Sequence, residues 1–355
     1  MVDPPRARAA SAPPIITLEP VACPKCGRGE SHVVVTGKDY LYGVPGEFFA
    51  VECERCGFWY QNPRPDERSL TRLYPPAYGP HQPPDARSHG PARGRLTADY
   101  LSRRLGYEHL VTADPDHLGR LWAALSRAWI EWRTGLDLIP HYVEDGKLLD
   151  IGCGNGERLA SLRQLGWRDC CGIELVAGAA EQARAAGFTV ECGSVEEQLA
   201  RFPRAGLDVI IASMLLEHLH DPRSVVREVA TRLRPGGEFL FSTVTRDSVE
   251  AKLYGSYWSG FDFPRHMVYF RLADIEDMLR DDFEHVERFH ENAPVDFLRS
   301  SSWRRGEAGS VFDRLVMILA GSRLGRVPSG VLARLGLTSR VSFRCRRRLT
   351  LRSRG

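Results

Sequence analysis

Four cysteines near the start of the chain stand in two short pairs. Cys23 and Cys26 are separated by two residues, as are Cys53 and Cys56, and a glycine follows each pair. This spacing lets both sulfurs of a pair face one ion, so two pairs supply the four thiolates of a closed, tetrahedral zinc site. Such a site stabilises a small module and does not activate water. The pattern predicts structural Zn²⁺; an iron–sulfur or redox centre and unrelated buried thiols are the alternatives.

A glycine-rich turn forms the second set of residues with chemical potential. The apolar run Leu148–Ile151 leads into Gly152, Gly154 and Gly156 and then into a helical pattern. Glycines let a ligand approach the backbone, and the helix start offers unpaired N–H groups. Glu174 ends the next predicted strand, where a doubly wound sheet places a carboxylate for ribose hydroxyls. The spacing does not fit the dinucleotide pattern GxGxxG. The alternative is an ordinary strand-to-helix turn beside a solvated carboxylate.

The segment Asp150-Ile-Gly-Cys-Gly-Asn-Gly156 resembles the first motif of class I S-adenosylmethionine-dependent methyltransferases. Three later segments follow in the order usual for that family, namely Leu207–Ile211, Leu216–Pro222 and Leu233–Phe239. The resemblance covers about Leu148 to Phe289. It implies a Rossmann-like, doubly wound α/β sheet, mostly parallel with one late antiparallel strand, and S-adenosylmethionine as the cofactor.

The resemblance also assigns parts of the cofactor to particular residues. Asp150 and the glycine turn are expected at the methionine part, Glu174 at the ribose, and Ser194 with Val195 at the adenine. Many relatives carry aspartate where Ser194 stands, so adenine recognition here is expected to use backbone groups. The expected cofactor-binding residues are Asp150, Gly152, Cys153, Gly154, Gly156, Glu174, Leu175, Ser194, Val195 and Met214.

Candidate acid–base residues follow two predicted strand ends. Methyl transfer from a sulfonium is an in-line displacement that requires alignment and exclusion of water, and an alcohol or carbon nucleophile must also lose a proton. Glu217 and His218 follow the fourth strand at the edge where ligands of open α/β sheets bind, and His266 lies in the loop after the fifth. These three are the catalytic candidates. Alternatively, Glu217 and His218 orient the neighbouring helix, and His266 is simply hydrogen-bonded.

The loop Tyr254–His266 combines aromatic and charged residues. In the methyltransferases that this chain resembles, the corresponding region covers the substrate. Tyr257, Trp258 and Arg265 are therefore the expected substrate-binding residues, with Arg265 pairing with an acidic or phosphorylated group. The structural alternative pairs Arg265 with Asp262 and places the Trp258 ring in a core beside the sheet.

The segment Cys56-Gly-Phe-Trp-Tyr-Gln-Asn-Pro-Arg-Pro65 resembles the N-terminal zinc ribbon of a group of class I methyltransferases. That group is often associated with modification of sugars and secondary metabolites. The resemblance implies that the ribbon helps to bind a small-molecule acceptor, such as a sugar, a nucleotide sugar or a secondary metabolite. The alternatives are an RNA or protein methyltransferase, a ribbon that contacts nucleic acid, and a non-catalytic nucleoside-binding module.

Hydrophobic patterns define the elements that must position these residues. Short β-like runs alternate with helical segments between Lys147 and Glu291, which is typical of βαβ units. Predicted strands are 147–151, 170–174, 189–192, 207–213, 237–243, 283–289 and 341–350, and predicted helices are 157–165, 177–186, 223–233 and 273–280. The expected organisation is a disordered tail (1–20), a zinc ribbon (21–78), a linker and helical connector (79–142), the methyltransferase domain (143–293), and a helical insertion with a closing strand (294–355).

Composition limits the classes of partner. The 355 residues carry a formal net charge of only +3, which does not favour nucleic acid. Prolines interrupt the first 20 residues, and no apolar run reaches the roughly 18 residues of a membrane span, so we expect a cytoplasmic protein without stable membrane insertion. The apolar stripe Val311–Leu319 is more typical of packing than of membrane contact. The oligomeric state stays open.

Overall fold

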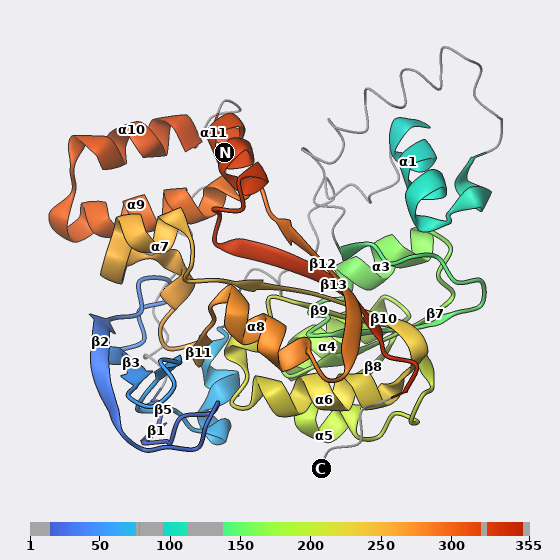
Figure 1. The fold of residues 1–355 in the computed structure, drawn as a ribbon, viewed down its shortest axis with the longest axis horizontal. Coiled ribbons are helices and arrows are strands. Elements are labelled where there is room, and N and C mark those ends of the chain that lie inside the picture. Colours follow the sequence, from blue (N-terminus) through green and yellow to red (C-terminus); the bar gives the residue numbers. More distant parts are fainter. Residues whose placement is uncertain (1–14, 76–77, 79–94, 112–137, 321–324, 351–355) are drawn as a thin grey trace.

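The computed structural model describes residues 15–75, 78, 95–111, 138–320 and 325–350 (Figure 1). Its central part alternates strands and helices, as the hydrophobic pattern predicts. The largest shift is in β10, which begins at Leu233 rather than at Gly237. The elements are β6 (Lys147–Ile151), α3 (Glu157–Gln164), β7 (Asp169–Glu174), α4 (Ala177–Ala185), β8 (Thr189–Cys192), α5 (Val195–Leu199), β9 (Leu207–Ser213), α6 (Pro222–Arg232) and β10 (Leu233–Val244).

The central sheet has seven strands in the order β12-β13-β10-β9-β6-β7-β8, where β12 is Phe283–His290 and β13 is Arg340–Arg347. Strands β6 to β10 are parallel, and β13 runs antiparallel to both β10 and β12. The predicted mostly parallel sheet with one late antiparallel strand is confirmed. Because the strand order reverses between β6 and β9, the carboxyl ends of these strands open a crevice where ligands of such sheets bind.

Helices cover both faces of this sheet. Successive side chains of a strand point to opposite faces, and in β6 the side chains of Leu148 and Leu149 belong to two different core clusters. The cluster around Leu148 contains side chains of α1 (Arg95–Leu105), α3 and α4. The cluster around Leu149 contains side chains of α5, α6 and α8 (Leu272–Leu279), together with residues of the cysteine-containing module.

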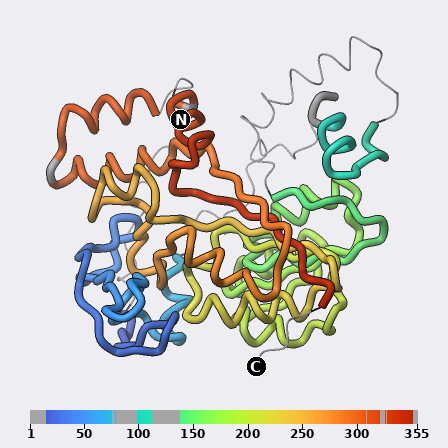
Figure 2. Tube along the Cα trace, viewed as in Figure 1, coloured from blue at the N-terminus to red at the C-terminus, as the bar shows by residue number. Residues whose placement is uncertain are grey.

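The N-terminal module is a small antiparallel sheet that the rest of the chain completes. Its order is β11-β4-β3-β2, formed by β2 (Ser31–Gly37), β3 (Phe48–Cys53), β4 (Trp59–Gln61) and β11 (Val268–Tyr269). Strand β11 comes from the loop after β10, so two distant segments share one sheet, which is visible as the blue module meeting orange chain in Figure 2. The expected tail also ends earlier than residue 20, because β1 (Leu18–Glu19) pairs with β5 (Arg64–Pro65).

Four further helices lie along the chain between β10 and β13. They are α7 (Val249–Tyr254), α9 (Pro294–Ala308), α10 (Val311–Ala320) and α11 (Arg326–Arg334). The expectation that the stripe Val311–Leu319 is buried by packing is wrong for most of its side chains, since Val311 is 73% exposed and Ile318 69%. Within the expected linker and connector (79–142), residues 79–94 lie outside the described residues, and α1 begins at Arg95. The central part of the expected connector, 112–137, also lies outside them.

Candidate active site

The glycine turn follows β6 at the carboxyl edge of the sheet. Gly152, Gly154 and Gly156 all have positive φ, between 55° and 86°, a conformation that residues with a Cβ rarely adopt. A Cβ at Gly156 would also lie 3.1 Å from the Cβ of Ala183 on α4. Gly156 is the N-cap residue of α3 and makes no side-chain hydrogen bond to the helix. The first N–H groups of α3 therefore have no hydrogen-bond acceptor from the side chain of the N-cap residue.

Asp150 lies at this turn and is 2% exposed. Its Oδ1 has no hydrogen-bond partner in the described structure, and its Oδ2 lies 3.8 Å from the Arg158 Nε. Burial, together with the charge of Glu174, raises the pKa of Asp150 to about 6 against the opposing charge of Arg158. A buried carboxylate with an unpaired oxygen is costly. A cationic or hydrogen-bond-donating ligand at this position would lower that cost.

Glu174 ends β7 and is buried beside Asp150. Its two carboxylate oxygens accept hydrogen bonds of 2.9 Å from the backbone N–H groups of Gly154 and Val176. These two bonds fix the carboxylate across the glycine turn. Two acidic groups from neighbouring parallel strands therefore meet at the start of α3, as the sequence predicted from their positions.

The remaining expected cofactor residues lie around the same sheet edge. The Ser194 hydroxyl caps α5 by accepting from the Glu197 N–H at 3.4 Å, and Val195 is buried behind it. Leu175 directly follows Glu174, and Met214 follows β9 with a φ of 50°. The Cys153 side chain points into the core cluster of α3 and α4, so only its backbone is available to a ligand.

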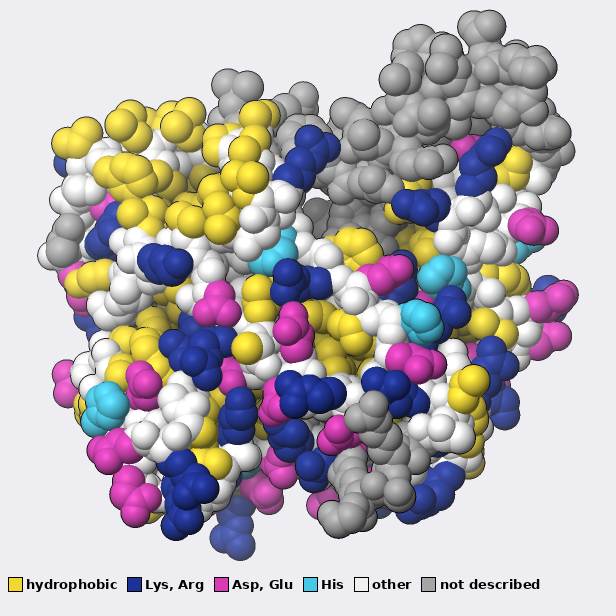
Figure 3. Space-filling model, viewed as in Figure 1, with side chains coloured by type: hydrophobic (Ala, Val, Ile, Leu, Met, Phe, Trp, Pro, Cys, Tyr) yellow, Lys and Arg dark blue, Asp and Glu magenta, His cyan; other side chains and the backbone are white. Residues whose placement is uncertain are grey.

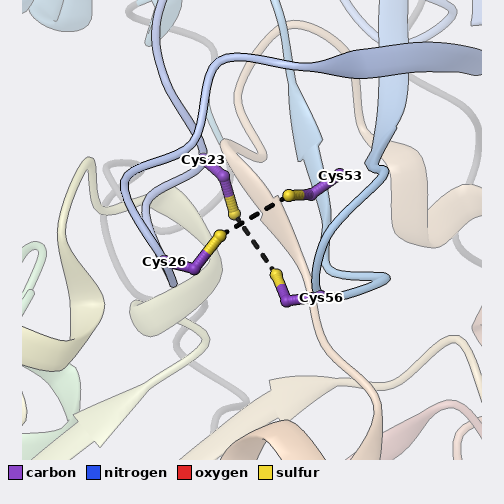
Figure 4. Close-up of side chains that lie close together, drawn as sticks. All are labelled: Cys23, Cys26, Cys53 and Cys56. Carbon is purple, nitrogen blue, oxygen red and sulfur yellow. Dashed lines mark hydrogen bonds between the residues drawn. The ribbon is translucent and has the colours of Figure 1, made fainter.

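The four paired cysteines converge as predicted (Figure 4). Cys23 Sγ lies 3.6 Å from Cys56 Sγ, and Cys26 Sγ lies 3.5 Å from Cys53 Sγ. Four thiolates at about 2.3 Å from a central zinc ion would be about 3.8 Å apart. The observed sulfur spacings are therefore close to those of a tetrahedral Cys₄ centre.

Two histidines face each other near the end of β9. The rings of His218 and His266 meet edge to face with centroids 4.5 Å apart. The His266 Nδ1 lies 2.8 Å from the carbonyl oxygen of Gly260, so in the neutral ring Nδ1 carries the proton and Nε2 the lone pair. That Nε2 lies 3.8 Å from an Asp262 oxygen. Protonation of His266 would therefore complete an ion pair.

The environment of His218 differs from that of His266. Its Nδ1 lies 3.1 Å from both the Arg265 carbonyl oxygen and the Tyr74 hydroxyl. Burial, reinforced by the neighbouring positive charges, lowers the pKa of His218 to about 3. His218 therefore stays neutral at physiological pH.

Glu217 is fully buried beneath the two histidines. Its Oε2 accepts a 2.8 Å hydrogen bond from the Thr243 hydroxyl of β10, while its Oε1 has no partner in the described structure. Burial raises the pKa of this carboxyl group. Its backbone carbonyl accepts from the Met267 N–H at 2.7 Å. Glu217 thus ties β9, β10 and the loop that carries His266 together.

Arg265 does not present its charge to a ligand. Its guanidinium is fully buried and donates to both oxygens of Asp39, at 2.6 and 3.0 Å, and to Asp262 at 2.8 Å. Arg265 and His266 hold the pKa of Asp262 down, at about 2, against the effect of burial. The expected pairing of Arg265 with an acidic acceptor is therefore not what this geometry provides. The structural alternative, pairing with Asp262, is present.

Of the other two expected substrate residues, Trp258 lines a narrow aromatic hollow that has no room for a water molecule. Trp258 is 1% exposed and belongs to a core cluster that includes Val244 of β10, so the structural alternative is present for this ring too; its Nε1 has no partner in the described structure. The Tyr257 hydroxyl donates to Glu307 at 3.1 Å. Asp262 also lines the hollow, as do Lys38 and Tyr40 of the N-terminal module.

Sequence reasoning did not single out Asp39 and Tyr74, two of the residues that the N-terminal module contributes to this region. Asp39 precedes Arg265 by 226 residues and Tyr74 precedes His218 by 144. Local motifs carry no signal for such pairs. The one sequence feature that could have indicated these two residues is the excess of charged and aromatic residues around Asp39 and around Tyr74.

Comparisons with known proteins agree with this architecture. Residues 121–282 match the model of a methyltransferase domain family. The ubiquinone biosynthesis O-methyltransferase of Bordetella avium is 32% identical over 139 residues, which is 38% of this chain and 56% of that protein. The enzyme of the same name from Albidiferax ferrireducens is 35% identical over 154 residues, 38% of this chain and 61% of that protein. The chain thus spans less than two thirds of the length of these curated relatives.

Among solved structures, an S-adenosylmethionine-dependent methyltransferase from Mesorhizobium loti is similar with 18% identity and a TM-score of 0.39, covering 58% of this chain and 94% of that one. The strand order, the glycine turn with its two carboxylates and the family match together define a class I methyltransferase architecture. The chain therefore contains a methyltransferase domain with the class I fold.

Proposed function

We propose that this chain transfers the methyl group of S-adenosylmethionine to a hydroxyl-bearing small molecule, such as a sugar, a nucleotide sugar or a secondary metabolite. The observation that carries the proposal is the buried Asp150, whose Oδ1 lacks a partner, beside Glu174 at the glycine turn. The cofactor is cationic at its sulfonium and ammonium groups, and the buried Asp150 carboxylate at the glycine turn provides complementary charge, while Glu174 would accept from the ribose hydroxyls. The residues present therefore fit this group.

Each part of the site has a proposed task. Glu174 would hold the ribose, the turn from Gly152 to Gly156 the methionine part, and the start of α5 at Ser194 the adenine. When bound, S-adenosylmethionine supplies an electrophilic methyl group. His266 would accept the proton of the acceptor hydroxyl at Nε2, because the adjacent Asp262 carboxylate stabilises the imidazolium that forms. His218 would pack against that ring and keep its orientation.

The acceptor is proposed to lie between the loop after β10 and the N-terminal module. Trp258 and Asp262 line the aromatic hollow together with residues of that module. Because this hollow has no room for a water molecule in the structure described, acceptor binding would require it to open. The printed names of the curated relatives describe O-methyltransferases of ubiquinone biosynthesis. These names support a hydroxyl as the methylated group.

We also propose that Cys23, Cys26, Cys53 and Cys56 bind one structural Zn²⁺. The sulfur spacings and the closed Cys₄ set support this assignment. All four ligand positions would be filled by protein, so the ion would hold the module together and take no part in methyl transfer.

Calorimetric titration with S-adenosylhomocysteine tests the cofactor assignment. The intact chain should bind it, and Glu174→Ala should weaken binding by about tenfold or more, since a charged hydrogen bond is lost. Asp169→Ala is the matched control, because it removes an exposed carboxylate from the opposite end of the same strand. Wild-type protein that shows no affinity, or equal losses in both variants, would refute the assignment. Formation of S-adenosylhomocysteine with panels of nucleotide sugars and phenols would then identify the acceptor class.

A further inference from the structure

The helical insertion before β13 exposes an unusual concentration of apolar side chains. Of the fourteen large apolar side chains exposed among the described residues, nine belong to α10, α11 and the turn after them. We call these nine the apolar patch, and Figure 3 shows hydrophobic side chains gathered in the region of α10 and α11. They are Val311, Phe312, Leu315, Ile318, Leu319, Val327, Val331, Leu335 and Leu337.

The patch lies on one face of each of two amphipathic helices. On α10, its members at 311, 312, 315, 318 and 319 span about 120° of the circumference at 100° per residue. On the other side of α10, Asp313 is fully buried and pairs with Arg304 of α9 at 2.7 Å. On α11, Val327 and Val331 are one helical turn apart, and Leu335 follows at the same spacing. Monomers rarely expose an apolar surface of this kind without using it for binding.

The charge of the surrounding segment indicates what binds there. From 309 to 337 the sequence contains four arginines and one carboxylate, Asp313, which is already buried and paired. Arg314 is exposed beside the α10 face. A second copy meeting this patch across a two-fold axis would bring together two segments that each carry a net positive charge in the sequence. Anionic lipid headgroups provide the opposite charge, and acyl chains accept the apolar face.

We propose that the apolar patch binds the surface of a bilayer that contains anionic lipid. None of the described helices has the length and hydropathy to span a membrane, so the helices would lie in the headgroup region with α10 and α11 parallel to the surface. This is peripheral binding, which is consistent with the expected absence of stable insertion. This proposed role differs from the packing role that the sequence predicted for the stripe Val311–Leu319.

The patch is firmly connected to the loop over the candidate active site. Helix α9 packs against both α10 and α7 (Figure 1). Its Ser300 hydroxyl accepts a 2.9 Å hydrogen bond from the Ser259 N–H, and its Ser301 hydroxyl lies 2.7 Å from the Tyr254 hydroxyl. Membrane binding would therefore hold the loop Tyr254–His266 in a fixed orientation relative to the lipid surface.

Flotation of the purified chain with vesicles tests the proposal. We expect binding to vesicles of phosphatidylcholine mixed with phosphatidylglycerol, and weaker binding to phosphatidylcholine alone or at high salt. The double variant Ile318→Asp/Val331→Asp should reduce binding by about tenfold or more, because two apolar side chains leave the lipid. Val33→Asp is the matched control, since Val33 is 55% exposed on β2. Circular dichroism of each variant verifies that it is folded.

Three outcomes would overturn the proposal. The wild-type chain fails to float with the mixed vesicles; the double variant floats as well as the wild type; or light scattering shows a dimer that the double variant dissociates while neither protein floats. The third result would assign the patch to a second copy. None of these outcomes affects the cofactor assignment, because S-adenosylhomocysteine binding is measured without lipid.

Discussion

The two walls of the candidate active site are built from the chain in different ways. Most of the proposed cofactor wall comes from one continuous stretch between Lys147 and Val195, in which two βαβ units place Asp150, the glycine turn and Glu174 at neighbouring strand ends. The acceptor wall combines Asp39 and Tyr74 of the N-terminal module with the loop after β10. The first wall is specified by local sequence, and the second by contacts between segments far apart in the chain.

Because of this contrast, the two walls should respond differently to substitutions. The proposed cofactor wall belongs to the regular sheet, so we expect single substitutions in it to have local effects. The acceptor wall depends on a small module whose sheet is completed by β11 and whose charge pairs are buried. Disruption of the module should therefore damage the acceptor wall first, and the following experiments test this difference.

The largest effect is expected from loss of the Cys₄ centre. Cys53→Ser should abolish binding of one Zn²⁺ per chain, since structural zinc contributes about 10 kcal/mol or more to folding of small metal-dependent modules. The amides of β2 to β4 should then lose protection in hydrogen exchange, while those of β6 and β7 keep most of theirs. Cys192→Ser, outside the cluster, is the control. Unchanged protection in a zinc-free Cys53→Ser protein would contradict the zinc assignment.

Arg265→Met should have the next largest effect. It leaves Asp39 and Asp262 without their shared buried cation, and breaking a buried ion pair costs about 3–5 kcal/mol. Urea unfolding measures this loss. The control, Arg227→Met on the exposed side of α6, should change the free energy of unfolding by less than about 0.5 kcal/mol. Adding Asp39→Asn to Arg265→Met should restore part of the stability, and additive losses would contradict the pairing.

Asp262 gives a prediction about pH. Its pKa in the folded chain, about 2, is lower than the ordinary 3.8, so the ionised form is favoured by folding and stabilises the protein above pH 4. That contribution, about 2 kcal/mol, should be lost as pH falls from about 4 to about 2. Asp262→Asn should flatten this part of the pH dependence, whereas Asp169→Asn should leave it in place. The measurement is urea unfolding at a series of pH values.

The smallest expected effect concerns Ser194. Its hydroxyl caps α5, so Ser194→Ala should cost about 0.5–2 kcal/mol of stability. Ser248→Ala removes the equivalent cap of α7, far from the glycine turn, and should cost a similar amount. Only the Ser194 variant should also weaken binding of S-adenosylhomocysteine. Equal affinities in the two variants would remove Ser194 from the adenine side.

The fold and the meeting of Asp150, the glycine turn and Glu174 could largely be predicted from the sequence because their signals are local. Strand and helix periods located β6 to β10, and the glycine turn with Glu174 located the crevice. Ion pairs between residues far apart in the sequence leave no local signal. Arg265 was therefore expected to bind a ligand, although Asp39 neutralises its charge. The sequence also does not show which apolar side chains are exposed. The stripe on α10 has the period of a packed helix, and only the tertiary structure shows that it faces outward.

The central claim is that the turn from Asp150 to Gly156, with Glu174, holds S-adenosylmethionine beside His266. A crystal structure of the chain with S-adenosylhomocysteine tests it most directly. We predict that the ribose hydroxyls bind the Glu174 carboxylate and that the thioether sulfur points toward the His218–His266 pair. A ligand bound elsewhere, or one whose sulfur points away from this pair, would contradict the account.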